Sequence, residues 1–114
     1  MAAPKEVLDQ IRQAVEKTPV LLFMKGTASF PQCGFSARVI QVLESYGVPF
    51  KTVDVLANPL VREGVKEFAS WPTIPQLYVG GQFVGGCDIV LEMHEQGELE
   101  PLLREAAGSG AAQA

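Results

Sequence analysis

The sequence predicts an α/β domain in which helices flank both faces of one four-stranded mixed sheet. Segments with apolar residues at helical spacing alternate along the chain with short apolar runs. One such run, "VLLFM" at residues 20–24, is typical of a buried central strand. A second stretch, "QLYVGGQFVGG" at residues 76–86, predicts two short strands joined at Gly80 and Gly81. The resulting order, α-β-α-β-α-β-β-α-α, makes the first two strands parallel and the last two antiparallel.

Turn-forming and capping residues set the limits of the predicted elements. Pro4 suits the first turn of the first helix, and Gly47 is expected to end the second. Asn58 and Pro59 open the third helix, and Asp88 is expected to cap the fourth. The predicted helices span about residues 4–17, 34–46, 59–69, 88–94 and 98–107, and the second strand lies within residues 48–56.

The composition is that of a single folded domain. The 114 residues are 47% hydrophobic and 19% charged, which is enough apolar material for one core. We expect the domain to cover residues 4–107 and the small-residue tail, residues 108–114, to be disordered. The net charge of −4 argues against nucleic-acid binding. No apolar run approaches the roughly 20 residues of a membrane span, and the start of the chain lacks the apolar core of a secretory signal.

Cys33, in "PQCGFS" at residues 31–36, is the strongest candidate for chemistry. It lies at the predicted start of a helix, where backbone N–H groups and the helix dipole stabilise a thiolate. Ser36 stands where a second thiol would resolve a mixed disulfide, so an external thiol must do this instead, or Cys33 is a metal ligand. One cysteine is too few to hold zinc or an iron–sulfur cluster, so the other ligands would come from another subunit and from small thiols. The alternative, a buried structural cysteine, is disfavoured by the neighbours Gln32 and Gly34.

The stretch "WPTIP" at residues 71–75 is a rigid break before the hairpin. The bond between Ile74 and Pro75 is a candidate for a cis peptide, which would leave the backbone N–H and C=O of Ile74 free to pair with an extended peptide. The alternative is an ordinary turn at the start of a strand.

The stretch "GGCD" at residues 85–88 predicts an anion site. Gly86 and its neighbour permit close backbone approach, and the free N–H groups of the following helix attract negative charge. Lys25, Arg62 and Lys66 are cations that are candidates for the same cleft, although a solvated helix face is the ordinary explanation for the last two. A thiolate, a free backbone edge, an anion site and cations together suit a small acidic thiol peptide such as glutathione.

Four motifs, "FMKGT", "PQCGFS", "WPTIPQLYV" and "GGCDI", occur in the order and spacing of a known family, and the chain resembles the monothiol glutaredoxins with a Cys-Gly-Phe-Ser active site. The resemblance covers about residues 6–105. It implies the thioredoxin fold and a cis bond before Pro75.

The resemblance also implies the roles of the site residues. Lys25 would meet the glycine carboxylate of glutathione, with Arg62 nearby, and Ile74 would pair with its cysteinyl unit. Cys87 and Asp88 would hold the γ-glutamyl end, beside Gly86. Lys66 is a weaker candidate that we add to those the resemblance supplies. Cys33 would ligate iron.

The function implied is that of a carrier. Two copies would share one labile [2Fe-2S] cluster, held by two protein cysteines and two glutathione thiols, and would pass it to apo iron–sulfur proteins. A BolA-like protein would be able to replace one copy.

The alternatives are a weak glutathione-dependent oxidoreductase that removes glutathione from protein mixed disulfides through Cys33, and an interaction module without chemistry. The expected compartment is the chloroplast stroma, with the mitochondrial matrix and the bacterial cytoplasm as alternatives. A regulatory disulfide between Cys33 and Cys87 is a further prediction.

Overall fold

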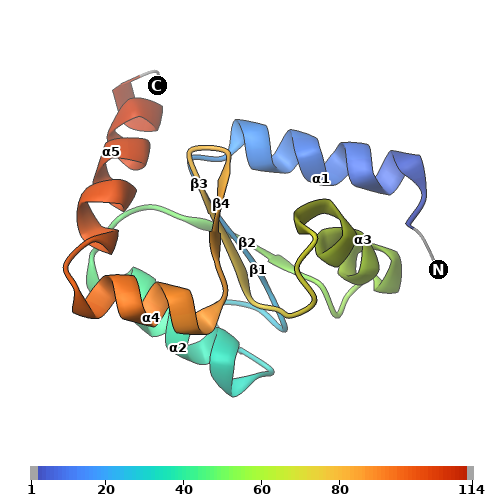
Figure 1. Ribbon diagram of the computed structural model, residues 1–114, viewed down its shortest axis with the longest axis horizontal. Helices are drawn as coiled ribbons and strands as arrows, with labels where there is room; N and C mark the ends of the chain where they lie inside the picture. The colour runs from blue at the N-terminus through green and yellow to red at the C-terminus, as the bar shows by residue number, and fades with distance from the viewer. Residues whose placement is uncertain (1–2, 113–114) are drawn as a thin grey trace.

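Nine helices and strands follow one another in the predicted order within the described part of the chain. The computed structural model describes residues 3–112, with side chains through residue 108. Figure 1 shows the elements, which are α1 (Lys5–Lys17), β1 (Val20–Met24), α2 (Gly34–Ser45), β2 (Lys51–Asp54), α3 (Pro59–Ala69), β3 (Gln76–Val79), β4 (Gln82–Gly85), α4 (Cys87–Glu95) and α5 (Leu99–Ala112).

The sheet confirms the predicted mixture of parallel and antiparallel strands. Its strand order is β2-β1-β3-β4. β1 is parallel to β2, with Leu21 opposite Lys51, and antiparallel to β3, with Leu22 opposite Leu77. β3 and β4 form the predicted hairpin. All five residues of β1 are buried, because this central strand is covered on both faces.

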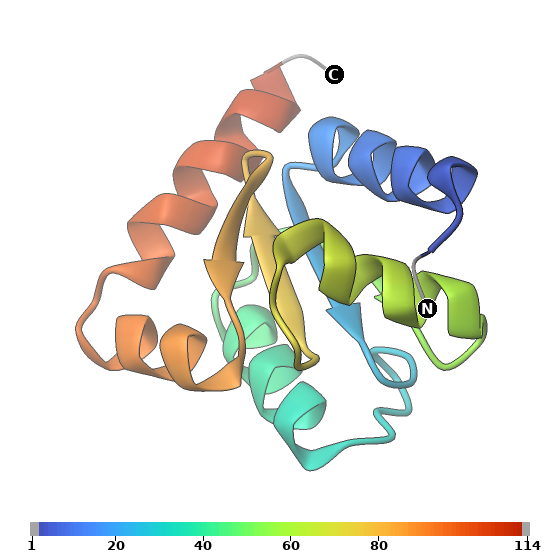
Figure 2. The same cartoon turned by 45° about the vertical axis from the view of Figure 1, so that its right-hand side comes forward.

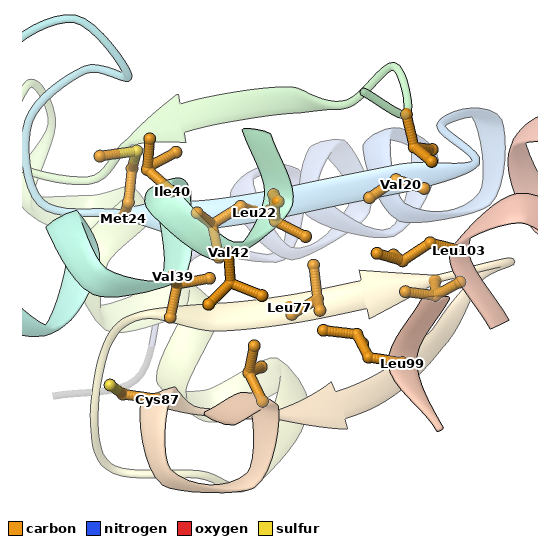
Figure 3. Packing of buried hydrophobic residues seen from close by; sticks show 14 residues of the cluster. Val20, Leu22, Met24, Val39, Ile40, Val42, Leu77, Cys87, Leu99 and Leu103 are labelled. Atoms are coloured by element: carbon orange, nitrogen blue, oxygen red, sulfur yellow. The ribbon is translucent and has the colours of Figure 1, made fainter. Parts of the chain in front are cut away.

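Two helical layers cover the two faces of the sheet (Figure 2). α1 and α3 pack together on one face, where Ile11, Val15 and Val65 meet sheet residues such as Phe23. α2, α4 and α5 lie on the other face, and Figure 3 shows their apolar side chains gathered against Leu22 and Leu77. Among the described residues, no helix is long and apolar enough to cross a membrane.

Local signals place most helix ends where the sequence predicted them. Pro4 precedes α1, and the Asn58 side chain caps α3 by accepting a hydrogen bond from the Leu60 N–H at 2.9 Å. Gly47 follows α2 with a φ of +67°, a left-handed conformation that glycine adopts without strain.

Two predictions about helix ends are wrong. Asp88 does not cap α4, because the cap residue is Gly86. Asp88 lies within the first turn, where its negative charge interacts favourably with the helix dipole. The chain after residue 107 is not without regular structure, because α5 continues to Ala112. The segment extends a helix that is already formed, which avoids the cost of nucleation, and two of its five residues are alanine, the best helix former. The last two residues of the predicted tail, 113–114, lie outside the described part of the chain.

Candidate functional site

The loop after β1 is fixed by backbone contacts before it reaches Cys33. Gly26 has a φ of +90°, and a side chain there would lie 2.6 Å from the backbone N of Gln32. The Gly26 N–H donates to the Asp54 carboxylate at 2.9 Å, and the Gln32 N–H donates to the Lys25 carbonyl at 2.9 Å. The loop therefore holds Lys25 and Cys33 in a defined relation at the end of the central strand β1.

Cys33 is the N-cap residue of α2, and its thiol is partly exposed. The backbone N–H of Ser36 lowers the pKa of this thiol most strongly; burial opposes the effect, and the Phe35 N–H and the Lys25 charge add to it. No hydrogen bond of normal geometry closes the cap with the neutral thiol. The N–H groups therefore act on the charge that forms when the thiol ionises, and Cys33 is suited to react as a thiolate.

Ser36 has a role that the sequence did not reveal. Its side chain is fully buried, and its Oγ atom accepts a hydrogen bond from the Lys25 N–H at 3.2 Å. Its hydroxyl also lowers the pKa of Cys33. The residue that replaces a second thiol thus ties α2 to the end of β1.

The segment 71–75 forms a second wall of the site. The peptide bond between Ile74 and Pro75 is cis, which confirms the expectation from the family resemblance. Ile74 lies outside β3, and among the described residues its backbone groups make no hydrogen bond. They remain available to an extended ligand.

A pocket of about 520 Å³ opens between these segments, within the size range of small-molecule sites. It brings together every site residue that the sequence predicted, including the weaker candidate. These residues are Lys25, Cys33, Arg62, Lys66, Ile74, Gly86, Cys87 and Asp88. Their roles toward a ligand stay predictions, but their convergence from five separate segments of the chain is a finding.

The cations of the pocket differ in what they contact. The Nε atom of Arg62 is buried and has no hydrogen-bond partner among the described residues. A buried N–H donor without a partner is costly, and the guanidinium that carries it is positively charged, so this group favours an anion in the pocket. Lys66 instead pairs with Glu63 at 3.3 Å. Arg62 is therefore better placed than Lys66 to receive a carboxylate.

Cys87 is the first residue of α4 and differs from Cys33 in its burial and in the direction in which its pKa is shifted. It is 9% exposed and lies at the edge of the apolar cluster (Figure 3). Burial raises the pKa of its thiol, and the Asp88 charge raises it further. Arg38 acts in the opposite direction, while the nearby Cys33 adds to the increase. Cys87 is thus the less reactive thiol at neutral pH, although both thiols face one pocket.

Sequence reasoning did not single out several apolar side chains that line the pocket. Phe35, Trp71 and Ile89 do so while 59%, 38% and 38% exposed. Their exposure depends on the relative positions of α2, α4 and the segment before β3, which no local pattern encodes. Exposed aromatic and branched side chains around a pocket are typical of a surface that another molecule covers.

The donor set of one chain is too small for a metal site. Among residues 3–112, no group of three or more His, Cys, Asp or Glu side chains is arranged to hold a metal ion. One partly exposed thiol, that of Cys33, is the donor that faces the pocket opening. An iron–sulfur cluster would fit here only as a shared cargo whose remaining ligands come from elsewhere.

A reactive thiol at the start of α2, on a four-stranded mixed sheet flanked by helices, is the arrangement of thioredoxin-fold proteins. The sequence pattern of the family described as Glutaredoxin matches residues 20–84. The chain therefore belongs to the glutaredoxin family.

Known proteins similar to the chain include single-domain and longer glutaredoxins. Glutaredoxin 4 of Haemophilus ducreyi is 51% identical over 102 residues, which cover 90% of this chain and 95% of that protein. The chloroplastic monothiol glutaredoxin-S7 of Oryza sativa is 52% identical over 101 residues, or 89% of this chain and 60% of that protein. The relatives thus include bacterial and chloroplastic proteins.

Solved structures agree with the fold. The reduced apo GrxS14 of poplar superposes with a TM-score of 0.75 at 50% identity, covering 86% of this chain and 90% of that one. A complex of buckwheat glutaredoxin with glutathione superposes with a TM-score of 0.80 at 28% identity, covering 90% of this chain and 91% of the other.

Proposed function

We propose that this monothiol glutaredoxin binds glutathione and carries a labile [2Fe-2S] cluster between two copies of the chain, for transfer to apo iron–sulfur proteins. The observation that carries the proposal is the pocket in which the Cys33 thiol, whose pKa is lowered, lies with Lys25 and with Arg62, whose buried Nε atom has no partner among the described residues. Cys33 would supply the iron ligand, and the cluster would be cargo rather than a resident cofactor.

Glutathione suits the pocket because its charges match the groups along the walls. Its glycine carboxylate would meet Lys25 and Arg62, and its cysteinyl unit would pair with the backbone of Ile74. Its γ-glutamyl end would lie at the start of α4, near Cys87 and Asp88, where Gly86 lets the ligand approach the backbone. The buckwheat relative, which binds glutathione, supports this assignment.

The number of thiolates supports a cluster shared between two copies. One chain offers one exposed thiol, whereas a [2Fe-2S] cluster takes four ligands, so two chains and two glutathione thiols would complete the set. The exposed Phe35, Trp71 and Ile89 around the pocket would be covered in such a dimer. A BolA-like partner, the apo protein acceptors and a stromal location rest on the family resemblance and stay predictions.

A second function uses the same thiol. The lowered pKa of Cys33 also suits attack on a glutathione mixed disulfide, which would leave glutathione on Cys33 and release the protein thiol. The thiolate of a second glutathione would then attack this mixed disulfide, which releases the Cys33 thiolate and forms glutathione disulfide, because Ser36 supplies no resolving thiol.

Anaerobic reconstitution with iron, sulfide and glutathione tests the carrier function. The expected result is a brown dimer with visible absorption, lost in Cys33→Ser and lost when glutathione is omitted. Cys87→Ser is the matched control, and it should still assemble the dimer because Cys87 is not an iron ligand in this scheme. A chain that stays colourless and monomeric, yet turns over a glutathionylated substrate, would favour the oxidoreductase instead.

A further inference from the structure

Gln76 is a fully buried polar residue at the start of β3, directly after Pro75. Its Nε2 atom donates two hydrogen bonds, to the Trp71 carbonyl at 3.1 Å and to the Thr73 carbonyl at 3.2 Å. Both acceptors belong to segment 71–75, which lines the pocket. One side chain therefore fixes the backbone of this wall from inside the molecule.

The orientation of the Gln76 amide follows from these contacts. Two carbonyl oxygens face one end of the amide, so that end must be the NH₂ group, since an oxygen there would be repelled. The Oε1 atom at the other end is buried and has no partner among the described residues. A buried carbonyl without a partner destabilises the fold, a penalty that an apolar residue would avoid.

The positions of the two acceptor carbonyls indicate why a buried glutamine is present here despite its unsatisfied oxygen. The carbonyls of Trp71 and Thr73 lie on either side of Pro72, and the next residue, Ile74, presents the free backbone edge. The Trp71 N–H also donates to the Lys66 carbonyl at 3.0 Å, and the Trp71 ring packs against Phe83. Without Gln76 the segment would keep these contacts at its start but lose the side-chain hydrogen bonds to its carbonyls. Its backbone would then occupy a range of positions, and a ligand would bear the cost of ordering it.

We propose that Gln76 is a positioning residue for the reaction of Cys33 with glutathione compounds, because its amide holds segment 71–75 in the shape that receives the tripeptide. This proposal rests on the proposed function only in taking glutathione as the ligand of the pocket. Gln76 itself is buried beneath the segment and does not line the pocket.

Two reagents separate positioning from thiol reactivity. The Cys33 thiolate attacks glutathione disulfide to form a mixed disulfide and release one glutathione thiolate, a reaction that needs the pocket. It also attacks iodoacetamide, which is small and neutral, with loss of iodide. The ratio of the two second-order rates, read at Cys33 by peptide mass spectrometry, measures recognition of the tripeptide alone.

Gln76→Met keeps the length of the side chain and removes both hydrogen bonds. We expect the rate with glutathione disulfide to fall about tenfold, as the loss of two buried hydrogen bonds would give, while the iodoacetamide rate stays within about twofold. The emission of Trp71, the single tryptophan of the chain, should shift in the same variant. Gln82→Met is the matched control, because Gln82 is exposed on the neighbouring strand and should change neither rate.

Three results would overturn the proposal. Unchanged rates with both reagents in Gln76→Met would show that the amide does not position the segment, and a parallel fall of both rates would show a general structural role. Loss of folding in both Gln76→Met and Gln76→Leu would show that the amide supports the whole sheet. Failure of the glutathione assignment is visible separately, since the wild type would then react no faster with glutathione disulfide than with hydroxyethyl disulfide.

Discussion

The Oγ atom of Ser36 accepts the backbone N–H of Lys25 at 3.2 Å, and this bond joins the helix that carries the thiol to the loop that carries a cation. Ser36 is the N3 residue of α2 when Cys33 is counted as the N-cap. The side chains of an N-cap residue and of the N3 residue lie next to each other, so the Ser36 hydroxyl is placed to donate a hydrogen bond to the Cys33 thiolate.

Replacement of Ser36 by alanine should raise the pKa of Cys33. The hydroxyl contributes to the lowered value and is a buried partner of Lys25, and alanine removes both contacts. The backbone N–H of residue 36, which lowers this pKa most, remains in the variant, so the iodoacetamide rate of Cys33 at pH 7 should fall by about threefold or less. The pH profile of this rate should shift to higher pH.

Ser45→Ala is the control for Ser36→Ala, since Ser45 lies at the far end of α2 and donates to the Val42 carbonyl. Its pH profile should match that of the wild type. An unchanged profile in a folded Ser36→Ala chain would contradict the role given to the hydroxyl.

The sequence predicted most of the fold because its signals are local. The apolar run of β1, the hairpin glycines and the cap at Asn58 act within a few residues, and each is found where it was expected. The site residues were predicted from motifs, and the pocket brings them together.

Features that depend on distant contacts were missed. The sequence shows Gln76 as one polar residue beside an apolar run, and its partners become visible once the chain before β3 has turned back over the strand. The predicted cap of α4 was also wrong. Gly86 takes the extended conformation of a cap residue, so the helix begins at Cys87, one residue before Asp88.

Arg62 and Lys66 should differ in their effect on glutathione recognition. Arg62 has a buried Nε without a partner, whereas Lys66 already pairs with Glu63. Arg62→Met should slow the reaction of Cys33 with glutathione disulfide about tenfold or more, as loss of a charge-assisted hydrogen bond predicts. Lys66→Met should slow it less than about twofold, because partly exposed pairs contribute little. Equal losses in the two variants would refute this ranking.

A side chain at Gly86 should narrow the pocket. An added Cβ would lie 3.2 Å from the Pro75 carbonyl oxygen and 3.4 Å from the indole nitrogen of Trp71, neither of which moves freely. Gly86→Ala should therefore slow the reaction with glutathione disulfide about tenfold, while the iodoacetamide rate is retained. Gly108→Ala is the control, since nothing lies within 4 Å of its added Cβ. A Gly86→Ala chain with wild-type rates would place the γ-glutamyl end elsewhere.

Oxidation should join Cys33 and Cys87. Both thiols line one pocket, and the one with the lower pKa, Cys33, reacts first with diamide. Attack of Cys87 on that sulfur would form the disulfide, with two hydrogens passing to the diamide. The intact mass should fall by two hydrogens, and faster at pH 9 than at pH 7, because the pKa of Cys87 is raised. Retention of both hydrogens at both pH values would exclude the disulfide. Cys87→Ser is the control, because it cannot form this disulfide.

Replacement of Tyr78 by phenylalanine should make the protein more stable. Its hydroxyl is buried without a hydrogen-bond partner among the described residues, and its ring packs edge-on against Phe23 at 5.7 Å between centroids. Tyr78→Phe keeps the ring and removes the unsatisfied group, so the free energy of unfolding at pH 7 should rise by about 1 kcal/mol.

The same substitution should change the response to alkali. Burial raises the pKa of Tyr78 from 10.0 to about 12. Because the unfolded chain loses this proton first, ionisation of Tyr78 leaves the free energy of unfolding unchanged below pH 10 and lowers it as the pH rises toward 12. Urea unfolding across this range should show a shallower decline for Tyr78→Phe than for the wild type. Tyr46→Phe is the contrasting variant: its hydroxyl pairs with Nδ1 of His94, so its loss should lower stability at pH 7. A Tyr78→Phe chain less stable than the wild type at pH 7 would show that the hydroxyl has a partner after all.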